Sequence, residues 1–171
     1  MRHSVRIAKF NYVKKTKSLE TTKKYFNESK SLSAIELKEF SLLYLLMNNL
    51  DLMKENLHLI ENVNLFTEVN KQIFSKIISK LKLEDKIILK DLEIDEQLIA
   101  KINKFAPIKY ILGKKNKNDH EIIGLLDDIN RDLKSYNLEL RIQELESKFS
   151  KDLSETTFNE LKELKKKQNI N

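Results

Sequence analysis

The spacing of apolar residues divides the chain into a patternless start and a helical remainder. From Val69 to Leu81 the apolar residues are separated by four, one, three, one and three positions, which places them on one side of a 3.6-residue helix. From Phe40 to Met47 the sequence is apolar nearly all round, as in a helix at the centre of a core. The pattern predicts an all-α fold, with residues 1–31 as a tail or linker that holds a short helix around Leu19–Phe26.

Local signals indicate where the first predicted helices begin and end. Ser33 and Glu36 have the spacing of a capping box, so a helix is expected to begin at Ser33. Asn48–Asn49 predicts a turn, because asparagine bonds its own backbone and tolerates unusual conformations. A second helix is expected over roughly Leu50–Glu61, and Asn62–Asn64 is the next break.

The middle of the chain carries weaker signals. The β-branched residues of Leu83–Leu92 suit a short strand, but an isolated strand has nothing to pair with, so a helix or loop is favoured. Asp95 is placed to cap a further helix, which Pro107 ends because proline lacks a donor and disfavours helix in the residue before it. Gly113 predicts the end of a short helix or turn over 108–112.

The last fifty residues predict a helical hairpin. A long amphipathic run extends from about Asp119 to Phe149, a polar break follows at Ser150–Ser154, and a shorter run continues to Leu164. Ser154 is expected to cap the second helix, with Leu153 packing against Phe158 as a hydrophobic staple. Two sets of residues on the long run repeat every seven positions, as in a coiled-coil seam: Ile122, Ile129 and Tyr136, and Leu126, Leu133 and Leu140.

These elements predict a small helical bundle followed by a C-terminal helical hairpin. The expected organisation is a basic tail or linker over 1–31, a bundle over 32–113, and a long helix with its hairpin over 114–171. The composition agrees, because two Gly and one Pro in 171 residues leave little material for β-turns.

Composition also excludes several classes of function. The chain has no Cys, which removes disulfides, thiolate metal sites and thiol nucleophiles. No apolar run is long enough to cross a bilayer, and the charged N-terminus lacks a secretory signal core. We therefore expect a cytoplasmic protein with no membrane contact.

Net charge is concentrated at the N-terminus. The chain carries +6 overall, but residues 1–30 hold nine basic and two acidic groups, which leaves −1 for the rest. Such a tail can contact nucleic-acid phosphates. It can also be a solvated linker, which is the commoner role of a charged run.

The sequence holds no constellation of catalytic residues. Its two glycines are isolated, and His3, His58 and His120 have no second ligand at metal spacing. Asp127–Asp128 points to different faces of a helix, which argues against a metal site. We expect no enzymatic activity, no metal, no cofactor and no small-molecule ligand.

The predicted hairpin is the strongest candidate for a binding site. Its second helix is too short to cover the whole apolar face of the first, and an uncovered apolar face marks a partner site. We expect a protein partner at the distal part of the arm. The candidate partner-binding residues are Leu138, Arg141, Ile142, Leu145, Phe149, Phe158 and Leu161.

Three stretches resemble the C-terminal helicase-binding domain of bacterial DNA primase, of the DnaG type. Glu36–Met47 with the following Leu50–Met53 is similar to the opening of that family, and Asn64–Val69 looks like the start of its "LF.EL" helix. The closing helices, with Asp152–Glu155 between them, carry the most specific similarity. The resemblance covers about residues 32–168, and it departs at Leu50, where the family often has proline.

The resemblance implies a bundle whose terminal hairpin docks onto the N-terminal domain of the replicative helicase and recruits primase to the replication fork. It implies a fragment or separate domain, with the tail as the linker to an absent polymerase domain. Two alternatives remain open. One is the helicase's own N-terminal domain, although its usual opening signature is missing. The other is a helical nucleic-acid-binding or scaffold protein that acts through residues 1–30.

Overall fold

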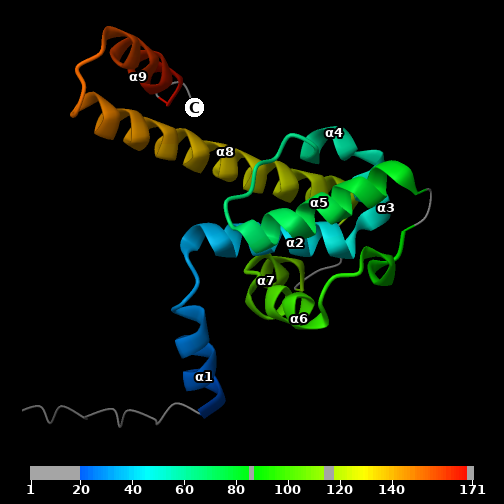
Figure 1. Ribbon diagram of the computed structural model, residues 1–171. Helices are drawn as coiled ribbons and strands as arrows, with labels where there is room; N and C mark the ends of the chain where they lie inside the picture. Colours follow the sequence, from blue (N-terminus) through cyan, green and yellow to red (C-terminus); the bar gives the residue numbers. More distant parts are fainter. Residues whose placement is uncertain (1–19, 85–86, 114–117, 169–171) are drawn as a thin grey trace, which may run out of the picture. The chain divides into compact units, whose positions relative to one another are not determined.

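The computed structural model describes residues 20–84, 87–113 and 118–168, and within these ranges every regular element is a helix. The predicted all-α fold is confirmed. Figure 1 shows the order of the elements. Their bounds are α1 Glu20–Ser29, α2 Ala34–Asn48, α3 Leu50–Glu55, α4 Leu57–Ile60, α5 Glu68–Leu83, the 3-10 helix η1 Leu89–Leu92, α6 Glu96–Phe105, α7 Ile108–Leu112, α8 Asp119–Phe149 and α9 Glu155–Gln168.

The chain divides into two compact units between Ser31 and Leu32. In the first unit the described part is α1, where the Phe26 ring is exposed and the Lys30 ammonium lies 4.5 Å from its centroid. The predicted helix around Leu19–Phe26 corresponds to α1, while most of the basic tail lies outside the described residues.

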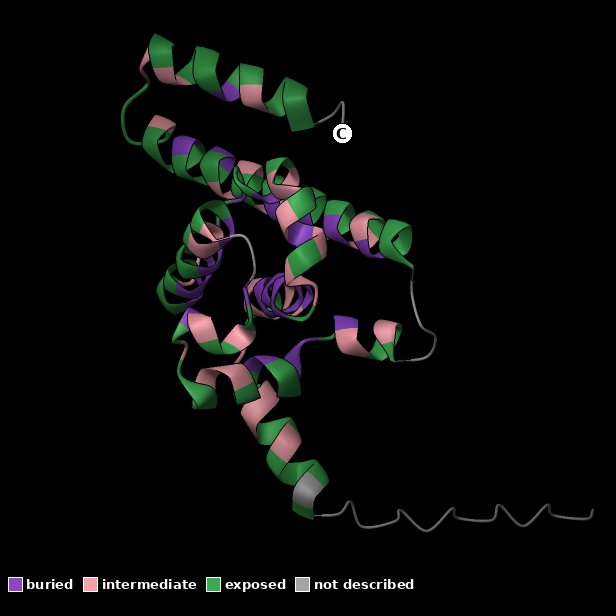
Figure 2. Cartoon of the chain, turned by 90° about the vertical axis from the view of Figure 1, so that its right-hand side faces the viewer, coloured by how far each residue is buried: buried purple, intermediate pink, exposed green. Residues whose placement is uncertain are grey.

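The second unit is built around α2, which is buried on nearly every side. Leu42, Leu43, Leu45 and Leu46 have no exposed surface, and helices α3, α5, α6, α7 and α8 all contact α2. Figure 2 looks nearly along α2, which lies in purple at the centre of the surrounding helices. The apolar run of the sequence therefore forms the central core helix, as predicted.

The ends of α2 follow from the polar residues beside it. The Ser33 hydroxyl accepts a hydrogen bond from the Glu36 amide at 3.1 Å, so the predicted N-cap is confirmed. The Glu36 carboxylate reaches Lys101 at 3.4 Å. At the other end, the side chains of Asn48 and Asn49 each donate to a carbonyl of the last turn at 2.8 Å, which satisfies acceptors that the helix leaves open.

The prediction of one helix over Leu50–Glu61 is wrong in its continuity. The structure has α3 and α4 instead, separated at Asn56. The Asn56 side chain donates to the carbonyl of Leu52 at 2.9 Å. Local bonding of this kind competes with the helical backbone and favours a break.

The helix ends predicted in the middle of the chain are found in the structure, and only the conformation of Gly113 differs from expectation. Asp95 caps α6 by accepting from the Gln97 amide at 2.8 Å, and the helix ends before Pro107. Leu83–Leu92 contains the end of α5 and η1, and its described residues form no strand. Gly113 ends α7 with φ of −68°, so the ending does not use the left-handed conformation that glycine permits.

The N-terminal half of α8 packs on the bundle. Leu126 and Leu133 are buried, the Asn130 amide donates to the Leu59 carbonyl at 3.0 Å, and the rings of Phe66 and Tyr136 meet edge to face at 5.0 Å. The described residues after Leu32 therefore form one unit. The boundary predicted at 113/114 separates two stretches that share a core, because half of α8 belongs to that core.

One carboxylate is fully buried in this core. Glu39 of α2 accepts hydrogen bonds from the backbone amides of Phe66 and Thr67, the latter at 3.1 Å, and from the Asn70 side chain at 2.7 Å. Phe66 and Thr67 precede α5, so Glu39 supplies acceptors for the open amides at the start of that helix. A negative group at a helix N-terminus is also favoured by the helix dipole.

We expect Glu39→Ala to lower the free energy of unfolding by about 3 kcal/mol, because it leaves one buried and two partly buried donors without an acceptor. Urea unfolding followed by circular dichroism measures the change. Glu139→Ala, on the exposed surface of α8, is the matched control and should stay within about 0.5 kcal/mol of wild type. Equal stability of the two variants would show that Glu39 does not fix the start of α5.

Candidate functional site

The C-terminal hairpin has a small apolar core of its own. Ile142, Leu145 and Leu161 are buried together, and Leu138 and Leu164 pack against them. Figure 1 shows α9 returning alongside the distal part of α8, beyond the bundle. The predicted hairpin, with its long helix over Asp119–Phe149, is confirmed. A core of this size is marginal by itself, so most of its stability comes from the continuity of α8 with the bundle.

Two exposed ion pairs cross the seam between the helices. Arg141 lies 2.7 Å from Glu160, and Lys165 lies 2.6 Å from Glu146. The hydrogen bond and the charge of Glu160 raise the pKa of Arg141 above its ordinary value. Because both pairs are exposed, they set the register of the helices more than their stability.

The residues predicted to bind a partner all lie at this seam. The structure brings the seven residues together, but most of them pack against one another across the seam. Ile142, Leu145 and Leu161 are buried by the opposite helix, and Arg141 pairs with Glu160. The rings of Phe149 and Phe158 lie 5.7 Å apart. The apolar face that the sequence left without a partner is thus mostly covered within the chain.

The turn of the hairpin leaves apolar side chains exposed, and of these the list of predicted partner-binding residues contains Phe158 but not Leu153. The Leu153 side chain is 79% exposed and Phe158 is 49% exposed. We define the hairpin tip as Phe149, Leu153 and Phe158. The predicted packing of Leu153 against Phe158 therefore leaves most of Leu153 uncovered. The signal available in the sequence was a leucine placed inside a polar turn, where no helical stripe explains it.

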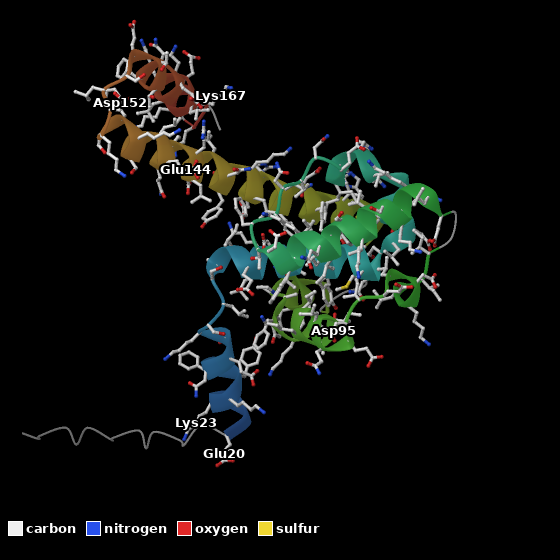
Figure 3. All side chains as sticks on the ribbon, viewed as in Figure 1. Glu20, Lys23, Asp95, Glu144, Asp152 and Lys167 are labelled. Atoms are coloured by element: carbon white, nitrogen blue, oxygen red, sulfur yellow. The ribbon has the colours of Figure 1, made fainter. Side chains whose placement is uncertain are left out.

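Ser154 stands immediately before α9, as predicted for a cap. Its carbonyl accepts from the Phe158 amide at 3.0 Å, which begins the helix. Its hydroxyl is paired with the Thr156 hydroxyl at 2.6 Å. Figure 3 marks Asp152 in the turn and Lys167 in the last turn of α9.

Two general properties of the described residues bear on the kind of site. Among them, no three His, Asp or Glu side chains gather as metal ligands would. None of the helices in the described ranges has the length and apolarity needed to cross a bilayer.

In comparisons with family models, curated proteins and solved structures, the chain has no match.

We expect Leu145→Asp to open the hairpin while the bundle stays folded, because Leu145 is buried against α9 and an unpaired charge is costly there. Hydrogen exchange followed by mass spectrometry should show protection lost in α9 and the end of α8 but kept in α2 and α5. Glu144→Asp, at the neighbouring exposed position, is the control and should leave the pattern unchanged. Loss of protection throughout α2 would show that the hairpin is part of the main core.

Proposed function

We propose that this chain is the helicase-binding domain of a bacterial DNA primase and that its hairpin docks onto the N-terminal domain of the replicative helicase. The order of bundle, long helix and terminal hairpin agrees with the architecture that the sequence resemblance implies. The motifs of that resemblance lie on α2, at the start of α5, and on α8 and α9.

The observation that carries the proposal is the exposed apolar tip at the end of α8. Leu153 and Phe158 are exposed on the hairpin, whose buried residues are those of the seam between α8 and α9. Apolar side chains gathered at a projecting point favour burial by a partner, and aromatic residues are frequent at the energetic centre of interfaces. The hairpin tip is the contact we assign to the helicase.

The seam residues have a supporting role in this proposal. Ile142, Leu145 and Leu161 hold α9 against α8, which fixes the positions of Leu153 and Phe158 before the partner arrives. A rigid tip loses little conformational entropy on binding, so preorganisation contributes to affinity. The domain itself would do no catalysis. It would hold primase at the helicase in the cytoplasm, and the helicase would be its principal partner.

The direct test is calorimetric titration of this chain with the N-terminal domain of the helicase from the same organism, at two salt concentrations. We expect a dissociation constant of about 1 μM or tighter, or roughly −8 kcal/mol, with little change between the two salts. Binding through the basic tail would instead weaken steeply with salt. No binding to a folded helicase domain would reject the proposal.

We expect Leu153→Ser to weaken helicase binding by about tenfold, because it removes an apolar anchor from the interface. The matched control is Leu83→Ser, since Leu83 is 82% exposed at the end of α5 and has the same side chain. The control should bind like wild type. Equal losses, or none for Leu153→Ser, would remove the hairpin tip from the interface even if the helicase binds elsewhere.

A further inference from the structure

The folded unit has a strong internal asymmetry of charge. Residues 97–118 hold six lysines and no acidic residue, whereas the rest of 32–171 holds seventeen basic and twenty-four acidic residues. A stretch of net charge +6 thus stands in a unit whose remainder carries −7. A surface with an excess of positive charge attracts anions at physiological salt.

The three lysines of this stretch that the structure describes are held over aromatic rings. The ammonium groups lie 5.4 Å from the Phe40 ring for Lys101, 5.0 Å from Phe105 for Lys104 and 5.1 Å from Tyr110 for Lys109. A ring face orients a cation but leaves its charge in place.

The polar partners of Lys101 and Lys109 show where these two ammonium groups lie. Lys101 pairs with Glu36 at 3.4 Å, which offsets part of its charge. Lys109 donates to the carbonyls of Asn103 and Lys104 at 2.9 and 3.2 Å. These bonds bring the Lys109 ammonium to the end of α6, close to the backbone of Lys104, so the two residues belong to one surface.

An exposed aromatic ring lies beside the Lys109 ammonium. The exposed ring belongs to Tyr110, whose side chain is 58% exposed. We define the α6–α7 surface as Lys101, Lys104, Lys109 and Tyr110. Cations beside an accessible ring are the combination that binds single-stranded nucleic acid, because phosphates pair with the lysines while a base stacks on the ring.

We propose that the α6–α7 surface binds single-stranded nucleic acid without sequence preference. An acidic peptide would use the lysines, but it would gain nothing specific from the exposed ring of Tyr110. Duplex DNA offers phosphates but no free base face for stacking. The proposal is independent of the helicase contact, which lies at the hairpin tip.

The first test is fluorescence anisotropy of a labelled dT20 oligonucleotide with the full chain across a salt series. Lys104→Gln/Lys109→Gln should lower the slope of log affinity against log salt by about 1.4, since each phosphate contact to a single strand contributes about 0.7. The matched control, Lys148→Gln/Lys151→Gln, removes the same charge near the hairpin turn and should keep the slope. The basic N-terminus contributes equally to both variants. Equal effects of the two pairs would overturn the proposal.

The second test addresses the ring. Tyr110→Ala should weaken dT20 binding about tenfold through lost stacking, and Tyr110→Phe should retain wild-type affinity. Thermal melts confirm that each variant is folded. Wild-type affinity for Tyr110→Ala, or displacement of dT20 by polyglutamate at equal charge concentration, would overturn the proposal. The second result would indicate a site for acidic peptides instead.

Discussion

The Glu39 carboxylate joins α2 to the start of α5 at a point that water does not reach. It comes from the middle of α2 and accepts hydrogen bonds from the residues that begin α5. Because α2 contacts most of the other helices, fixing the start of α5 against α2 also fixes the positions of the helices that pack on these two. Apolar contacts alone tolerate sliding along a helix, whereas three hydrogen bonds to one carboxylate allow a single register.

The long helix α8 takes part in two cores of unequal size. Its first half packs on α2 and is hydrogen-bonded to α4 through Asn130 and Leu59, and its distal part is buried against α9. This division explains how a hairpin with so few apolar residues is stable, because its longer helix is already formed by the larger core. It also separates the roles within the chain. The bundle provides stability, the seam holds α9 against α8, and the tip stays exposed.

Much of the fold follows from local signals, and the parts that do not follow depend on distant contacts. Ser33, Asp95 and Pro107 set helix ends through neighbours in sequence, so their effects were predictable. Nothing near Glu39 indicated that its carboxylate meets residues twenty-seven or more positions away. The candidate site shows the same limit. The apolar stripe identified the hairpin correctly, but only the packing of α9 distinguishes seam residues from the exposed Leu153.

The hairpin is attached to the bundle through one uninterrupted helix, and this gives it leverage. From Tyr136, which contacts Phe66 of the bundle, thirteen residues of α8 lead to Phe149, a length of about 20 Å. Tilting α8 by about 10° where it packs on the bundle would therefore move the tip by about 3.5 Å, as rigid-body geometry requires of a helix of that length. Small rearrangements among the core side chains around Leu126 and Leu133 are amplified at the tip. A force applied at the tip acts on the same core through the same arm.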